Sequence, residues 1–166
     1  HPWHGVGARL TDAGGRSFLA WSIWLDYRAY ITYELRDNPD MSDADLLAAE
    51  DVRSNRLPQA RSLIAHLREA GQLEADIPVI VGGDWNTPSH LDWTDDTARV
   101  FKRRRNLDLP VSIAMHDAGF SDAFRVVHPD PVQQPGITWS PMFRGTDDTP
   151  QGFERIDRVY LKNPDR

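Results

Sequence analysis

The sequence contains no cysteine in 166 residues, which excludes disulfides and thiolate metal sites. Any bound metal would therefore need oxygen or imidazole ligands. The chain also lacks the apolar run of about 18 residues that a membrane-spanning helix requires, so no membrane span is predicted. An excess of basic residues is missing too. The formal net charge is −6, which argues against non-specific binding to a nucleic-acid backbone.

What the chain does contain is enough apolar material for one folded domain, since 40% of its residues are hydrophobic. The patterning predicts mixed strands and helices without a strict β-α-β alternation. Strands are expected over 6–10 and 17–25, joined as a hairpin, and aromatic residues on both faces of the second favour a strand that is covered on both sides. Ser42 is expected to cap a helix, and a helix after Pro58 should bury Ala60, Leu63, Ile64 and Leu67. Helices are further predicted over 95–105 and 112–118, extended segments over 79–81, 121–127, 137–139 and 155–161, and a poorly ordered loop over 141–152.

The first candidate site follows the apolar strand 79–81. Two glycines end the strand and lead to Asp84 and Asn86, which a strand-like period of two would place on the same side. A carboxylate and a carboxamide together suit a hard cation or a phosphate group. The alternative is a simple turn, because Gly-Gly-Asp and Asn-Thr-Pro are turn-forming sequences.

The second candidate site is Asp157, within the strand predicted over 155–161. Alternation places its carboxylate on the same face as Val159 and Leu161, where an unpaired charge would be unfavourable. Asp157 therefore needs a partner. The partner could be a functional group, or a neighbouring arginine such as Arg155 in a structural ion pair.

Four motifs together resemble the endonuclease/exonuclease/phosphatase superfamily. Residues 83–86 resemble its Gly-Asp-(Phe/Trp)-Asn motif, and residues 155–160 its later Arg-Ile-Asp strand. Residues 56–59 and 136–139 resemble its Arg-x-x-Gln helix and its Thr-Trp strand, in the family's order. Residues 88–93 and 117–125 resemble a bacterial subgroup. Such an ordered set is far more specific than Asp-x-Asn alone.

The resemblance implies an α/β fold, a four-layer sandwich of two facing, mostly antiparallel sheets flanked by helices. The family's metal-binding glutamate would precede His1, and its closing Ser-Asp-His motif would follow Arg166. Residues 1–166 are therefore expected to be an internal part of a single domain of this type. By the same comparison, the isolated chain is expected to be inactive.

The implied activity is divalent-metal-dependent hydrolysis of a phosphate ester, with Mg²⁺, or alternatively Mn²⁺ or Ca²⁺, as cofactor. By resemblance, Asp84 would orient or deprotonate the attacking water. Asn86 would hold that carboxylate and contact the phosphoryl group, and Asp84 and Asn86 are both expected to ligate the metal. Asp157 would orient a catalytic histidine.

Three residues are expected to bind the substrate. Trp24 stands where the family usually has a phosphate-contacting histidine, and an indole cannot carry that charge or proton. His90 follows the Asp84–Asn86 loop and would contact phosphate, although it could instead cap the next segment. Arg155 is the third.

The expected partner is a small or lipid-derived phosphate ester. A DNA or RNA nuclease of the same superfamily is the alternative, which the acidic charge disfavours. A non-catalytic binding module is a rival suggested by Trp24, and a glycosidase that uses Asp84 and Asp157 as its carboxylate pair is disfavoured by Asn86. Family resemblance slightly favours a bacterial, secreted or periplasmic protein over a cytoplasmic one.

Overall fold

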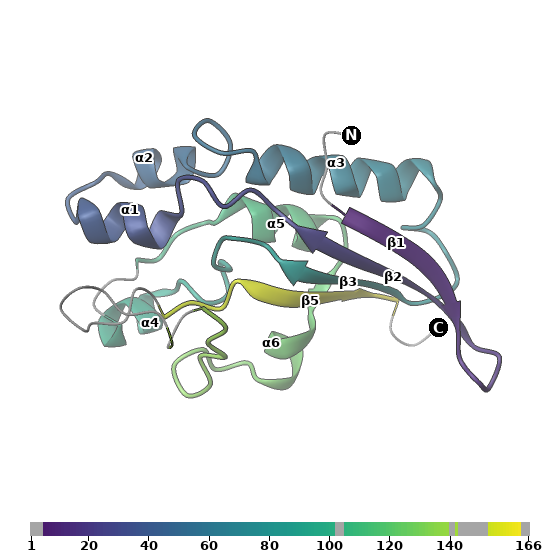
Figure 1. Cartoon of the computed structure of the whole chain (residues 1–166). Coiled ribbons are helices and arrows are strands. Elements are labelled where there is room, and N and C mark those ends of the chain that lie inside the picture. The colour runs from purple at the N-terminus through teal and green to yellow at the C-terminus, as the bar shows by residue number, and fades with distance from the viewer. Residues whose placement is uncertain (1–4, 102–104, 140–141, 143–152, 164–166) are drawn as a thin grey trace.

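The computed structural model describes residues 5–101, 105–139, 142 and 153–163 (Figure 1). In chain order, its elements are β1 (Gly5–Thr11), β2 (Ser17–Trp24), α1 (Ile31–Asp37), α2 (Asp43–Ala48), α3 (Arg56–Glu69), β3 (Val79–Asp84), α4 (Asp95–Val100), α5 (Pro110–Asp117), β4 (Ser121–Asp122), α6 (Ala123–Val127) and β5 (Asp157–Lys162). The fold is α/β, as the sequence predicts.

The strands form one mixed sheet in the order β1-β2-β3-β5-β4. The hairpin of β1 and β2 is confirmed, and it joins β3 through a parallel pairing of β2 with β3. The other pairings are antiparallel. The described ranges contain this single five-stranded sheet, so the expected two-sheet sandwich is not confirmed.

Helices α3 and α5 cover one face of the sheet. Leu19, Trp21 and Ile23 of β2 point into this core, as do Val79 and Val81 of β3. From α3 the core receives the predicted stripe of Ala60, Leu63, Ile64 and Leu67. Because these residues recur every three or four positions, one side of the helix is apolar and packs on the sheet.

The opposite face of the sheet, here called the open face, carries Val6, Leu10, Ser22, Trp24 and Val159. Val6 is 70% exposed, Trp24 61% and Val159 44%. The expectation that β2 is covered on both faces is therefore wrong for the described part of the chain. Its alternation buries one set of side chains and leaves the other in solvent.

A second core lies beside α1 and α2, at the end of the sheet where β2 ends (Figure 1). It is formed by Ile31 and Leu35 of α1, Leu46 of α2, and Trp93, Leu107 and Leu109. The expected cap of α2 is confirmed, because the Ser42 hydroxyl accepts a hydrogen bond from the backbone N–H of Asp45. This core supports the loops that follow β2 and β3.

Three element predictions were wrong in whole or in part. Residues 121–127 were expected to be extended, but only β4 is, and α6 follows because the Asp122 carboxylate accepts hydrogen bonds from the N–H groups of Phe124 and Arg125. The helix predicted over 95–105 ends at Val100, and Phe101 is already extended. Residues 137–139 contribute only an isolated bridge from Trp139 to Glu154. Most of the loop predicted over 141–152 lies outside the described residues.

None of the helices within the described ranges has the length and apolar character needed to cross a membrane.

Candidate active site

The candidate site lies at the end of β3, where three strands bring polar side chains together. Asp84 is the register partner of Trp24 on β2 and of Asp157 on β5. Residues directly opposite each other in an antiparallel pair have Cβ atoms about 4.5–5.5 Å apart, so the two carboxylates are neighbours. The sequence separates Asp84 and Asp157 widely, and the sheet joins them.

Asn86 turns back toward Asp84 and is 8% exposed. Its φ angle is +50°, a left-handed conformation that asparagine tolerates better than most residues. The side-chain Nδ2 donates to the Leu25 carbonyl oxygen at 2.9 Å and to Asp84 Oδ2 at 3.1 Å. The turn and the site are therefore the same feature, and Asn86 holds the Asp84 carboxylate in place.

Burial raises the pKa of Asp84 above its ordinary value. The hydrogen bond from the Asn86 backbone N–H, 2.9 Å from Oδ1, opposes this shift by stabilising the charged form. The negative charge of Asp157 raises the pKa of Asp84 further. Asp84 therefore holds a proton more tightly than an exposed aspartate, which is a property of a carboxylate that is to accept a proton or bind a cation.

Asp157 is exposed at the start of β5. The Thr138 hydroxyl accepts hydrogen bonds from the backbone N–H groups of Ile156 and Asp157, both at 3.0 Å, and this fixes the entry to the strand. Across the described residues, the Asp157 carboxylate forms no ion pair, and the predicted structural pair with Arg155 is absent. Asp157 does share a face with Val159, but this is the exposed open face and not the core face that the apolar pattern indicated, so the carboxylate is not buried there.

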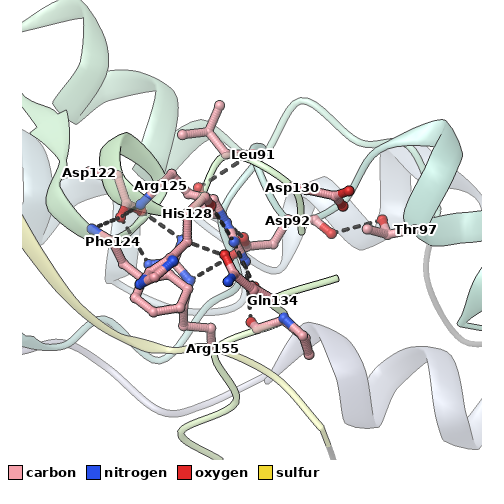
Figure 2. Close-up of polar contacts among 12 residues, drawn as sticks. Leu91, Asp92, Thr97, Asp122, Phe124, Arg125, His128, Asp130, Gln134 and Arg155 are labelled. Atoms are coloured by element: carbon pink, nitrogen blue, oxygen red, sulfur yellow. Dashed lines mark hydrogen bonds and ion pairs between the residues drawn. The ribbon is translucent and has the colours of Figure 1, made fainter. Parts of the chain in front are cut away.

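Arg155 instead points to the opposite side and lies in a buried cluster with Asp92, Asp122 and Arg125 (Figure 2). Its Nη2 lies 2.9 Å from Asp92 Oδ2 and 2.7 Å from Asp122 Oδ2. Burial by itself would lower the pKa of Arg155, but the charges and hydrogen bonds of these two carboxylates outweigh it and raise the pKa. Arg155 is 2% exposed, and its guanidinium is already bonded to two buried carboxylates. Its expected contact with substrate stays a prediction.

His90 lies beside α5 rather than beside Asp84. Its Nδ1 is 2.8 Å from the Ser112 hydroxyl, and its backbone N–H donates to the same oxygen at 2.9 Å. Burial, and then the nearby His116 and Arg158, lower the pKa of His90 and favour the neutral ring. Among the described residues, no hydrogen bond connects His90 to Asp84, Asn86 or Asp157. Its role in binding phosphate is therefore a prediction that these contacts do not test.

Trp24 lies next to Asp84 as its register partner on β2, and its role in binding substrate stays a prediction. The polar indole of Trp24 favours the charged form of Asp84 and so lowers the pKa of that carboxyl, against the larger effect of burial. Trp24 also lines a shallow pocket with Asp26, Tyr27, Arg28 and Asn55. The position can therefore contact a substrate by stacking and donation, but it supplies no positive charge.

The available ligands suit a cation that keeps much of its water. In the parts of the chain that are described, no three or more acidic, histidine or cysteine side chains are arranged so that they could hold a metal ion. The site offers the carboxylates of Asp84 and Asp157 and the Asn86 Oδ1, since Asn86 Nδ2 is already used twice. Mg²⁺ usually binds to few protein carboxylates and completes its octahedron with water and phosphate oxygens, so these residues fit it.

The sequence did not reveal several residues that support the site. Glu50, Thr87 and Arg158 are buried directly beside it. Thr87 directly follows the motif over residues 83–86, and Arg158 lies within the motif over residues 155–160, which was the available signal. Nothing in the sequence around Glu50 indicated that it would face Thr87, because 36 residues separate them and only the fold brings them together.

Comparison with known proteins identifies the family. The model of the endonuclease/exonuclease/phosphatase family matches residues 2–165. An uncharacterised Caenorhabditis elegans protein, F14F9.5, is 31% identical over 165 residues, covering 96% of this chain and 52% of that protein. The chain thus spans about half the length of this relative.

Two solved structures are also similar. The human Nocturnin catalytic domain has a TM-score of 0.46 at 17% identity, with 95% of this chain and 40% of that chain covered. Truncated Caenorhabditis elegans TDP2 has a TM-score of 0.44 at 18% identity, with 91% and 43% covered. The match of the family model over almost the whole sequence shows that this chain belongs to the endonuclease/exonuclease/phosphatase family.

Proposed function

We propose that the intact protein hydrolyses a phosphate ester with the help of a divalent metal ion, and that Asp84, Asn86 and Asp157 are part of its active site. The observation that carries this proposal is the cross-strand pairing of Asp84 with Asp157. Like charges placed directly opposite each other destabilise a sheet unless something positive lies between them or beside them. A metal ion or a histidine cation would provide that charge.

Asp84 is the residue proposed to orient the attacking water and accept its proton. Its raised pKa brings it closer to the range in which a carboxylate accepts a proton efficiently. Asn86 fixes the orientation of this carboxylate through Nδ2 and presents Oδ1 to a cation. A bound Mg²⁺ would neutralise the charge that develops on the phosphoryl oxygens. Asp157 is proposed to orient a histidine and fix its tautomer.

The rest of the site is proposed to come from the remaining part of the full-length protein. The resemblance assigns it a metal-binding glutamate and a closing Ser-Asp-His motif. We propose that it also supplies the second sheet of the sandwich, which would pack on the open face. The exposure of Val6, Trp24 and Val159 supports this arrangement, because an apolar sheet face is normally covered.

The proposed substrate is a small or lipid-derived phosphate ester, and nucleic acid is the second candidate. The net charge of −6 favours the first, since duplex binding needs a basic surface to displace counterions. Compartment and bacterial origin stay predictions.

The test is an assay of the full-length protein with bis-p-nitrophenyl phosphate, sphingomyelin vesicles and duplex DNA, each with Mg²⁺ and with EDTA. We expect metal-dependent turnover of the first or second substrate to exceed DNA cleavage. A reversed order would favour the nuclease. Absence of turnover on all three would favour a non-catalytic binding module.

A further inference from the structure

A buried polar chain runs directly beneath the Asp84–Asn86 loop, and the proposed chemistry does not use it. Glu50 and Thr87 are 0% exposed, and Arg158 is 2% exposed. Thr87 connects the other two residues. Its hydroxyl donates to Glu50 Oε1 at 2.9 Å, and its carbonyl oxygen accepts a hydrogen bond from Arg158 Nη1.

Glu50 is itself held rigidly. The fully buried Arg56 donates from Nε to Glu50 Oε1 at 3.2 Å. The same guanidinium also donates to four backbone carbonyl oxygens, those of Asp26, Arg28, Ala29 and Ala49. Because these carbonyls belong to the segment after β2 and the end of α2, Glu50 is anchored to the second core.

Arg158 anchors the other end of the chain in β5. Its Nη1 also lies 3.3 Å from the Arg155 carbonyl oxygen, and its own carbonyl accepts a hydrogen bond from Trp85 Nε1 at 3.2 Å. Arg158 directly follows Asp157. Thr87 therefore links the loop of Asp84 and Asn86 both to the anchored Glu50 and to the strand that carries Asp157.

This chain of contacts is poorly suited to stability alone. In the described structure, Glu50 Oε2 and Arg158 Nε and Nη2 are buried without a hydrogen-bond partner. Burial raises the pKa of Glu50 despite the nearby Arg56. Buried charges of this kind stabilise a fold less than apolar side chains of the same size would. Because these charged groups lie beneath the Asp84–Asn86 loop, they are better explained as holding the loop in a fixed geometry.

The loop has a conformation that benefits from such support. Asn86 is one of three non-glycine residues with positive φ among those described, and Thr87 is its immediate neighbour. We propose that Thr87, held between Glu50 and Arg158, is a positioning residue that keeps Asp84 and Asn86 in register with Asp157 for phosphoester hydrolysis. The inference rests on the proposed function.

The test compares Thr87→Val with Thr87→Ser in the full-length protein. Valine keeps the shape and removes the hydroxyl, whereas serine keeps the hydroxyl. The assay uses saturating Mg²⁺ and a range of bis-p-nitrophenyl phosphate concentrations. We expect Thr87→Val to lower kcat by about 10- to 100-fold, the usual effect of removing a residue that orients the groups in contact with the metal or substrate. KM should change little, and Thr87→Ser should retain most of the wild-type kcat.

Thr97→Val is the matched control. Thr97 is equally buried, and its hydroxyl donates to the Asp92 carbonyl oxygen at 2.8 Å, away from Asp84 and Asn86. We expect its kcat to be unchanged per folded molecule, with folding followed by near-ultraviolet circular dichroism. If Thr87→Val is folded and has the wild-type kcat, or if Thr97→Val loses as much, the inference is wrong.

Glu50→Gln provides a second route to the same question. If Glu50 acts through Thr87, the combined Glu50→Gln and Thr87→Val effects on kcat should be smaller than the product of the single effects. If the two substitutions lower kcat by independent factors that multiply, Glu50 does not act through Thr87. If the wild-type protein is inactive toward every phosphate ester, the proposed function itself is wrong. That outcome differs from an active wild type whose kcat does not depend on Thr87, which would contradict only the positioning role.

Discussion

The backbone of Ile23 occupies the space that a β-carbon would need at Gly83, immediately before Asp84. Gly83 has a φ angle of +149°, which side chains rarely permit, so this close approach of β2 and β3 requires glycine. The preceding Gly82 is different. A β-carbon there would make an ordinary contact with Val159 at 3.6 Å.

Gly83→Ala is therefore expected to destabilise the protein much more than Gly82→Ala. The first substitution must push β2 and β3 apart at the site, whereas the second adds a methyl group to the open face. Urea denaturation of both variants, followed by circular dichroism, measures the free energy of unfolding. Equal effects of the two substitutions would show that the strands are farther apart than the structure indicates.

Asp84→Asn is expected to reduce turnover of the full-length protein by about 10²- to 10⁴-fold, the range for loss of a general base. Asp117→Asn is the control, because its side chain is 72% exposed and lies at the end of α5. The initial rate with Mg²⁺ and bis-p-nitrophenyl phosphate is the measurement. Retained activity in Asp84→Asn would mean that the site lies elsewhere.

The same substitution should change the pH dependence of stability. Asp84 has a raised pKa in the folded state, so the folded protein binds this proton more tightly than the unfolded chain does. Its contribution to stability is present below about pH 3.9, the unfolded value, and is lost as pH rises through the folded pKa. Relative to wild type, Asp84→Asn should therefore become more stable between pH 4 and pH 7. The opposite trend in urea denaturation would contradict the direction of the shift.

Arg155→Met is expected to destabilise the fold by about 3–5 kcal/mol, because it leaves Asp92 and Asp122 partly unpaired in the interior. Arg16→Met is the comparison, since Arg16 pairs with Asp12 at the surface and should have little effect. Urea denaturation at neutral pH provides the values. A small change in Arg155→Met would show that the cluster relaxes or admits water.

Ser22→Cys is a probe of the open face. Ser22 is an exposed residue of β2 on the open face. Because the sequence contains no cysteine, the introduced thiol would be the only one in this chain. If the remaining part of the full-length protein packs on this face, the thiol should react quickly with a maleimide in this chain and slowly in the full-length protein. Arg61→Cys, on the exposed side of α3, should react quickly in both. Equal labelling of Ser22→Cys in both proteins would argue against a second sheet there.

Local patterns were sufficient for the elements whose burial follows their own periodicity. The stripe of α3, the hairpin and the Ser42 cap could all be predicted because each depends on residues close in sequence. The segment over 121–127 could not, since β-branched and aromatic residues there suggested a strand. The carboxylate of Asp122 caps a short helix instead.

The sequence by itself determined the family, the α/β class and the identity of Asp84, Asn86 and Asp157 as site candidates, because these depend on motifs that are short and ordered along the chain. Only the tertiary structure decided which of the candidates meet. Strand pairing places Asp84 opposite Asp157, while strand alternation turns Arg155 inward to Asp92 and Asp122. The Glu50 to Thr87 contact likewise depends on long-range packing, which no local sequence pattern encodes.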